Sequence, residues 1–276
     1  MNILLFVVGS STILHQQAHY ALRALHINSR CDDKLFILTD SPTLYYSLPF
    51  VEVCMISDSE LNEWRGKHGY FYRIKINAIR NFAKNHPNEH LVFVDCDTYC
   101  YGDLSMITDY LDHGLGVMHK DECSMEVMKG PCGEMWKQTK GRKFANITIT
   151  NNYHMWNSGV VGIPRDYSIQ VMEKALEICD SFLSSGITCW NMEQWAIAIA
   201  LSQFVPAIKE ADNIIGHYWH HKYVWSRFIA IFFTDSYAHG MTLEDELNVI
   251  RKTNFKWLKR RLATQRLFMK VFCSTY

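Results

Sequence analysis

Short apolar runs alternate with amphipathic stretches through the first hundred residues, and this alternation limits the fold more than any other feature. Residues 3–8, 34–39, 51–56 and 91–94 are mainly apolar runs of strand length, typical of strands that are buried on both faces. Between them, residues 14–25 and 70–84 carry apolar side chains at helical spacing. This alternation predicts a parallel sheet with helices on both faces.

The remainder of the chain shows a weaker pattern. Residues 114–118 and 160–163 are expected strands, and residues 166–184 and 191–204 are expected helices. No linker rich in Pro, Ser or Gly, no repeat and no low-complexity stretch divides the sequence. We therefore expect an α/β fold in which a single domain, residues 1–250, has a mixed central sheet flanked by helices.

The balance of residue types is that of an ordinary globular protein. Of 276 residues, 48% are hydrophobic and 20% are charged, and the net charge is zero, so no global field favours a nucleic-acid partner. The nine cysteines form no C-x-x-C pair, which argues against a zinc ribbon or a disulfide framework and favours reduced thiols in the cytoplasm. Residues 3–8 are too short for a signal sequence, and no apolar run approaches the roughly 20 residues that span a bilayer.

Two carboxylates directly follow the apolar run 91–94, in the sequence Asp95-Cys96-Asp97. Ligands of open α/β sheets bind outside the carboxyl ends of the strands, which is where these residues are expected. In an extended chain, alternation would place both carboxylates on one side and Cys96 on the other. Two carboxylates so close repel each other unless a cation lies between them, and Mg²⁺ and Mn²⁺ accept oxygen ligands of this kind. The alternative without a metal is that Asp95 caps a loop and Asp97 is solvated.

Two enzyme families carry D-x-D after an apolar strand. One is the haloacid-dehalogenase-like phosphatases, whose D-x-D-x-T motif resembles Asp95-Cys96-Asp97-Thr98 and whose first aspartate is a nucleophile. That motif usually opens its domain, whereas about ninety residues precede it here. The later acidic pair of that family has no good equivalent, because Asp32-Asp33 lies upstream and Gly102-Asp103 lacks the second acid four residues on. A phosphatase with Asp95 as nucleophile stays an alternative.

The other family is the GT-A sugar-nucleotide glycosyltransferases. Four more stretches resemble retaining family 8, which includes bacterial lipopolysaccharide galactosyl- and glucosyltransferases. The family's Y-x-R-x-K helix is resembled by YFYRIKINAI, and its F-N-S/A-G-V stretch by MWNSGVVGIP. Its D-Q pair is resembled by NMEQWAI, with Glu in place of Asp, and its H-x-x-G-x-x-K element by GHYWHHK, without the glycine. The resemblance covers about residues 70–222. It implies a GT-A (Rossmann-like nucleotide-diphospho-sugar transferase) fold, with residues 1–100 as the nucleotide-binding half and 101–250 as the acceptor half.

The resemblance also implies a reaction and a set of ligands. The chain would move a hexose from a UDP-sugar to a glycan or lipid-linked acceptor, with Mn²⁺ or Mg²⁺ held by Asp95, Asp97 and His217. The implied contacts to the donor are Val8, Gly9, Ser10, Thr39, Asp40, Arg73, Asn157, Gly159 and Lys222. Among these, Asn157 would hydrogen-bond hydroxyls of the sugar or ribose, and Gly159 would let the backbone approach the donor closely. If no metal or donor binds, His217 would belong to an aromatic cluster with Tyr218 and Trp219, and Arg73 and Lys222 would be solvated.

The E-Q pair bears on stereochemistry. In the retaining family a glutamine amide lies beside the anomeric carbon, so the resemblance implies retention with Gln194 in that place. Neighbours on a helix point about 100° apart, so we expect only one of Glu193 and Gln194 to face the site, and we favour Gln194. An inverting enzyme would need a carboxylate base, for which Glu193 and Asp121 are candidates. A further alternative is an inactive nucleotide-binding or scaffold protein.

The end of the sequence is strongly basic. Residues 251–276 contain eight of the 28 Lys and Arg residues and no acid, which leaves 20 basic against 28 acidic residues in the body. Apolar and aromatic residues lie between the basic ones, and we expect a helix over about residues 254–272. A basic amphipathic tail of this kind predicts peripheral contact with an anionic membrane, at its cytoplasmic face. The alternative is a C-terminal helix that packs on the domain.

Overall fold

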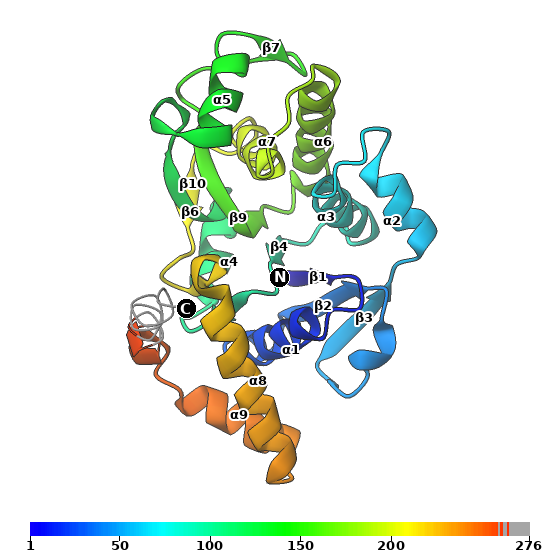
Figure 1. Cartoon of the computed structure of the whole chain (residues 1–276), viewed down its shortest axis with the longest axis vertical. Coiled ribbons are helices and arrows are strands. Elements are labelled where there is room, and N and C mark those ends of the chain that lie inside the picture. Colours follow the sequence, from blue (N-terminus) through cyan, green and yellow to red (C-terminus); the bar gives the residue numbers. More distant parts are fainter. Residues whose placement is uncertain (259, 262–263, 265–276) are drawn as a thin grey trace, which may run out of the picture.

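The computed structural model describes residues 1–258, 260–261 and 264, and its centre is a seven-stranded sheet (Figure 1). Its strands are β1 (Asn2–Val7), β2 (Lys34–Thr39), β3 (Val51–Met55), β4 (Leu91–Val94), β6 (Gly116–Ser124), β9 (His154–Ile163) and β10 (Ile208–Glu210). The order across the sheet is β10-β6-β9-β4-β1-β2-β3. Strand β9 runs antiparallel to both of its neighbours, and the other neighbouring strands are parallel. The prediction of an α/β fold with a mixed central sheet is therefore confirmed.

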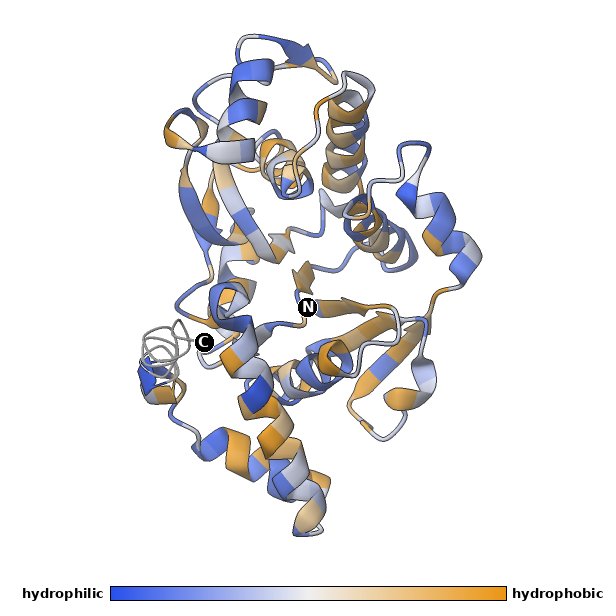
Figure 2. Cartoon of the chain, in the orientation of Figure 1, coloured by the Kyte–Doolittle hydropathy of each residue, from blue (hydrophilic) through white to orange (hydrophobic). Residues whose placement is uncertain are grey.

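Helices cover both faces of this sheet, as the alternating pattern predicted. The α-helices are α1 (Thr12–His26), α2 (Asp58–Arg65), α3 (Arg73–Asn85), α4 (Ser105–Asp112), α5 (Gly130–Thr139), α6 (Ser168–Ser184), α7 (Met192–Leu201), α8 (Lys222–Ala238) and α9 (Leu243–Lys252). Alternate residues of β1 divide between two cores: Leu4 packs in the core of α3, α6 and α7, whereas Ile3 and Leu5 pack in the core of α1, α4 and α8. Figure 2 shows the contrast between β1 and β4, which are mainly hydrophobic, and the two-sided helices α1 and α9.

Two smaller antiparallel pairs lie outside the main sheet. One joins β5 (Thr98–Cys100) to β11 (Ile215–His217), and the other joins β7 (Lys143–Phe144) to β8 (Ile147–Thr148). Because β5 follows β4 after only a short bend, the β5–β11 pair brings a late segment of the chain to the carboxyl end of β4.

Strands β6 and β9 are longer than the sequence predicted. The expected strands 114–118 and 160–163 match only one end of each. The other ends contain Lys120, Asp121 and Asn157, and the β6–β9 ladder has register shifts between residues 118 and 120 and between residues 121 and 123. A polar half-strand with bulges lacks the apolar run that identifies a strand in sequence.

The predicted tail, residues 251–276, begins inside the domain. Arg251 and Lys252 are the last residues of α9, and the buried ring of Phe255 lies 5.1 Å from that of Tyr99. The structure therefore shows no boundary at residue 250. Residues 255–258 are helical, but most of the expected helix 254–272 lies outside the described residues. Within the described ranges, no helix combines the length and the apolar character that crossing a membrane requires.

Candidate functional site

A cavity of about 320 Å³ opens at the carboxyl end of β4, a size at the lower end of the usual range for ligand-binding sites. It is lined by Phe6, Phe71, Tyr72, Ile74, Lys75, Phe93, Asp95, Cys96, Asp97, Glu122, Asn157, Ser158, Gly159, Trp190, Asn191, Glu193, Gln194, His217, Trp219 and Lys222. Its floor is formed by the ends of β1 and β4, the middle of β9 and the first turn of α7. Strand order reverses at β1 and β4, and open α/β sheets bind ligands at such a point.

Asp95 and Asp97 both line this cavity, but a bend brings them together rather than strand alternation. β4 ends one residue before Asp95, whose backbone N–H donates to the carbonyl of Gly159 (2.9 Å). The hydroxyl of Thr98 donates back to the carbonyl of Asp95 (2.7 Å), which fixes the bend. Cys96 is also among the lining residues, and its side chain packs against the core of α1, α4 and α8.

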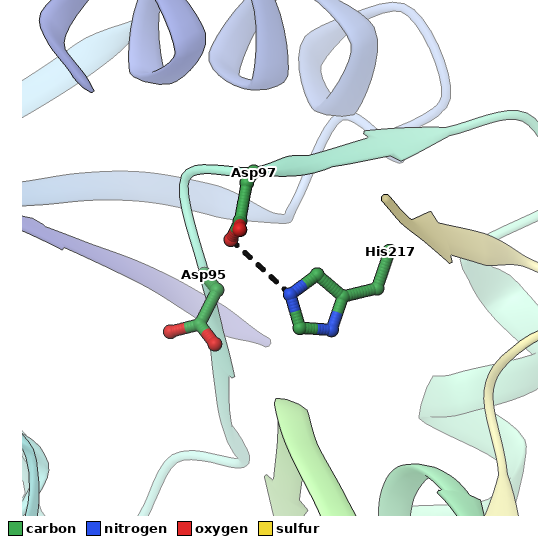
Figure 3. Close-up of side chains that lie close together, drawn as sticks. All are labelled: Asp95, Asp97 and His217. Carbon is green, nitrogen blue, oxygen red and sulfur yellow. Dashed lines mark hydrogen bonds and ion pairs between the residues drawn. The ribbon is translucent and has the colours of Figure 1, made fainter. Parts of the chain in front are cut away.

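His217 joins the two aspartates from β11, which pairs with β5. One ligand atom from each of Asp95, Asp97 and His217 lies within 4.8 Å of the others, a group that could hold a metal ion. Figure 3 shows the three side chains pointing into one space, with His217 Nε2 at 3.2 Å from Asp97 Oδ1. The predicted convergence of these residues, in which His217 joins from 120 positions beyond Asp97, is confirmed.

Asn157 determines which nitrogen of His217 is available to a ligand. Asn157 Oδ1 accepts the backbone N–H of Gly159 (2.9 Å), so this atom is an oxygen, and it lies 2.9 Å from His217 Nδ1. Nδ1 must therefore carry a proton and donate it, so that in a neutral ring the Nε2 lone pair faces Asp97. A lone pair and a carboxylate repel each other unless a proton or a metal cation lies between them. Metal-binding histidines are oriented by outer hydrogen bonds of this kind, so the residues present fit a metal ion.

The same contacts change the roles expected of Asn157 and Gly159. Asn157 Nδ2 donates to Glu122 Oε1 (3.1 Å), and its oxygen is engaged by His217 and Gly159. Asn157 therefore orients His217, and the second N–H of its amide is the group that it could offer to a sugar. Gly159 does permit a close approach, but by His217: a Cβ at this position would lie 2.2 Å from Nδ1 of that ring.

Two lysines are paired with the two aspartates. Lys75 Nζ lies 3.0 Å from Asp95 Oδ1 and donates to the carbonyl of Ser158 (2.8 Å). Lys222 Nζ lies 3.1 Å from Asp97 Oδ2. Burial alone would raise the pKa of Asp97, but its contacts with His217 and Lys222 outweigh burial and hold that pKa well below the usual range. Asp97 is therefore an anion at neutral pH, as a metal ligand must be.

Lys75 takes the place that the sequence assigned to Arg73. The two residues are separated by about 200° around α3, so they face different sides of the helix. Arg73 makes a two-pronged ion pair with Asp180 of α6 (2.7 and 3.0 Å) and does not line the cavity. The signal for Lys75 was present in the stretch YFYRIKINAI, but the spacing alone did not favour it over Arg73.

Glu193 and Gln194 both line the cavity, so the expectation that only one would face the site is wrong. Both belong to the first turn of α7, and the end of this helix faces the cavity rather than its side. Ser158 contacts both, through its N–H to Gln194 Oε1 (3.4 Å) and its hydroxyl to Glu193 Oε1 (3.5 Å). Burial raises the pKa of Glu193 to about 7, with Lys75 opposing the shift and Asp95 adding to it. Glu193 can thus exchange a proton near neutral pH.

Asp121 does not line the cavity. Its carboxylate lies 2.7 Å from His154 Nδ1 on the neighbouring strand β9. The next residue, Glu122, lines the cavity instead, as alternation along β6 requires. Whether Asp121 or Glu122 faces the cavity depends on the register of β6, which the polar sequence of this strand does not indicate.

The residues predicted at the ends of the first two strands lie beside the cavity lining rather than in it. They are Val8, Gly9, Ser10, Thr39 and Asp40. The backbone N–H of Gly9 donates to Asp40 Oδ2 (2.7 Å), which connects the end of β1 to the end of β2. Gly9 has a φ of 91°, in the region that favours glycine.

Four aromatic side chains at the cavity rim were not predicted. Phe71 and Tyr72 precede α3, Trp190 precedes α7, and Trp219 begins a short 3-10 helix, η3 (Trp219–His221). Their exposed fractions are 52%, 41%, 55% and 39%. Large aromatic side chains that remain exposed around a cavity with charged groups are typical of a binding surface.

Comparison of the sequence with models of known protein families, and with curated protein sequences, finds no match. Membership of a family is therefore not shown, and the geometry of the cavity is what supports a function.

Proposed function

We propose that this protein is a metal-dependent glycosyltransferase of the GT-A fold that moves a hexose from a UDP-sugar to a glycan or lipid-linked acceptor. One observation carries the proposal: Asp95, Asp97, His217, Lys75 and Lys222 converge on a single cavity at the carboxyl end of β4. Two carboxylates and an imidazole suit Mn²⁺, and Mg²⁺ is the second choice because it prefers oxygen ligands.

The charges around the cavity support a diphosphate donor. Without a cation, the two aspartates and the two lysines that contact them sum to zero. A divalent cation would add two positive charges, which matches the two negative charges of a nucleotide sugar's diphosphate. When bound, this cation would act as a Lewis acid that stabilises the charge developing on the leaving group. Lys75 and Lys222 place further positive charge on the same side of the site.

The sheet supports a nucleotide beside that diphosphate. β1, β2, β3 and β4 form a parallel half-sheet compatible with the nucleotide-binding half of a GT-A fold. The Gly9–Asp40 connection lies at the carboxyl ends of β1 and β2, next to the cavity. We place the uridine there, because the diphosphate would then reach the metal group at the end of the adjacent strand β4.

The first turn of α7 supports a retaining reaction. Gln194 lines the cavity, where its amide can lie beside the anomeric carbon. Glu193 contacts Tyr70 through Oε2 (3.3 Å) and Ser158 through Oε1 (3.5 Å), so both of its oxygens already face hydroxyl donors. We therefore favour retention. An inverted product would assign the base to Glu193 or Glu122, since Asp121 faces His154.

The aromatic rim supports a glycan as acceptor. Phe71, Tyr72, Trp190 and Trp219 offer exposed ring surface that can pack against the apolar face of a sugar ring. The charged residues of the cavity would then be left to the donor. A lipid-linked glycan would satisfy this rim as well as a free one, because only the sugar needs to reach the cavity.

The phosphatase alternative has less support. It requires an oxygen of Asp95 to attack phosphorus. The later acidic pair of that family also has no good equivalent in the sequence. Trapping of an acyl phosphate on Asp95 would nevertheless overturn the transferase proposal.

The proposal is tested with Mn²⁺ and a panel of UDP-hexoses. Thermal unfolding should shift upward with Mn²⁺ and UDP together, and one UDP-hexose should be hydrolysed slowly in the absence of an acceptor. Asp97→Asn should abolish both effects. The exposed Asp109→Asn, on α4, is the matched control and should retain them. Normal turnover and metal dependence in Asp97→Asn would refute the assignment, and the absence of both effects in the unmodified protein would favour an inactive protein.

A further inference from the structure

Two buried thiols and an amide oxygen are in contact beside the cavity. Cys132 of α5 and Cys189, in the loop before α7, have their sulfurs 3.8 Å apart. Both sulfurs lie within hydrogen-bonding distance of Asn191 Oδ1, at 3.1 and 2.7 Å. The two cysteines are only 7% and 5% exposed, and Asn191 lines the cavity.

Asn191 is also the N-cap residue of α7. An asparagine at this position normally accepts a hydrogen bond from a backbone N–H in the first turn of its helix. Here it makes no such bond, because its oxygen accepts from the two thiols instead. The thiols and the helix end therefore compete for one oxygen atom. That first turn of α7 contains Glu193 and Gln194, which line the cavity.

We propose that Cys132 and Cys189 are a peroxide-sensitive pair, and that their disulfide releases Asn191 to cap α7. A disulfide has no S–H to donate, so the Asn191 oxygen loses both of its present donors. A buried oxygen without a donor is costly, and an N-cap side chain can reach the N–H groups of the first turn, which have no carbonyl partner within the helix. Oxidation at this pair would thus change the helix turn that lines the cavity.

The chemistry is balanced with hydrogen peroxide as the oxidant. The Cys132 thiolate attacks one peroxide oxygen, the O–O bond breaks, and a sulfenic acid and hydroxide form. The Cys189 sulfur then attacks the Cys132 sulfur, the S–O bond breaks, and the oxygen leaves as water. In total, two thiols lose two electrons and two protons, and peroxide is reduced to two molecules of water.

The geometry suits this order of events. When Cys132 ionises, the single S–H of Cys189 can turn from Asn191 to the thiolate, and this hydrogen bond lowers the pKa of the Cys132 thiol against the opposing effect of burial, so Cys132 is the attacking sulfur. Disulfide formation requires the sulfurs to approach from 3.8 Å to about 2.05 Å. The pair is 57 positions apart in sequence, so the disulfide would connect α5 to the loop that leads into α7.

The first test maps the crosslink. Full-length protein is treated with hydrogen peroxide, remaining thiols are blocked, and peptides are analysed by mass spectrometry with and without dithiothreitol. We expect a reducible link between Cys132 and Cys189 that is absent from Cys132→Ser and Cys189→Ser. The exposed Cys31→Ser should form it normally. A link from Cys132 to Cys123, or oxidation confined to Cys31, would overturn the proposal.

The second test measures the helix. Hydrogen exchange at the first-turn amides of α7 should slow about fivefold after oxidation, the factor that corresponds to one N-cap of about 1 kcal/mol. Asn191→Ala should still form the crosslink but lose the slowing. Unchanged exchange in the crosslinked protein would refute the release of Asn191. Neither test uses a sugar donor, so failure of the proposed transferase activity would leave this result intact.

Discussion

Glu193 is the clearest place at which to test the site without knowing its substrate. Its carboxyl is buried in the cavity wall, and its pKa is raised from 4.5 to about 7, chiefly by burial. A carboxyl that resists ionisation in the folded protein affects stability in a defined pH range. The substitution Glu193→Gln keeps the shape of the side chain and removes the ionisation.

The sign and size of the effect follow from this shift. Below pH 4.5 the carboxyl is protonated in both the folded and the unfolded chain, so Glu193 makes no difference. Between pH 4.5 and 7 the unfolded chain releases the proton while the folded protein keeps it, so the free energy of unfolding falls as pH rises. The full loss, reached above pH 7, is about 3 kcal/mol. Glu193→Gln escapes this loss, so its advantage over the unmodified protein should grow by that amount.

Urea unfolding between pH 4.5 and 8.5, with a chelator to remove divalent cations, measures this difference. Glu89→Gln, at an exposed turn, is the control and should show no comparable pH-dependent gain. A constant difference between Glu193→Gln and the unmodified protein across this range would refute the reasoning. It would mean that Glu193 is solvated or is ionised in the folded state, and the proton-exchanging role near neutral pH would fail with it.

Three further predictions follow from other contacts. Gly159→Ala should weaken Mn²⁺ binding at least tenfold, measured by calorimetry, because the added Cβ would displace His217 from its position. Arg73→Met should lower the free energy of unfolding by roughly 1–2 kcal/mol through loss of its ion pair with α6, yet leave Mn²⁺ affinity unchanged, whereas a weakened affinity would restore Arg73 to the site. Reversal of two exposed charges, Lys256→Glu with Arg260→Glu, should weaken binding to anionic vesicles by at least tenfold, since each basic residue contributes about 1 kcal/mol there; equal binding would argue against membrane contact.

The parts of the fold that sequence predicted well are those with a continuous apolar signal. Strands β2 and β4 match the expected residues 34–39 and 91–94, because a strand buried on both faces must be apolar throughout. The polar ends of β6 and β9 were missed because they lack an apolar run, and part of them lines the cavity through Glu122, Asn157 and Ser158. The polar residues that suit this region to binding also remove the apolar pattern from which a strand is predicted.

At the site, sequence predicted the residues that meet but not the partners that hold them. Asp95, Asp97 and His217 were identified from a motif and an order of motifs, and the structure brings them together. Asn157 lies 60 positions from His217, and no local pattern indicates that its amide orients this ring. The choice of Lys75 over Arg73 likewise depends on which side of α3 faces the cavity.

These supporting contacts bear on which residue roles can be inferred from the resemblance to family 8. In the N-S-G stretch, each residue supports a neighbour: Asn157 and Gly159 position His217, and Ser158 contacts Lys75, Glu193 and Gln194. These three residues connect the metal group to the first turn of α7 through a single strand, β9. A short motif can therefore be decisive for a site because it sets the geometry of the groups that hold a ligand. On this basis, substitutions in the stretch should alter metal affinity and the environment of Glu193 together, whereas substitutions at the rim aromatics should alter neither.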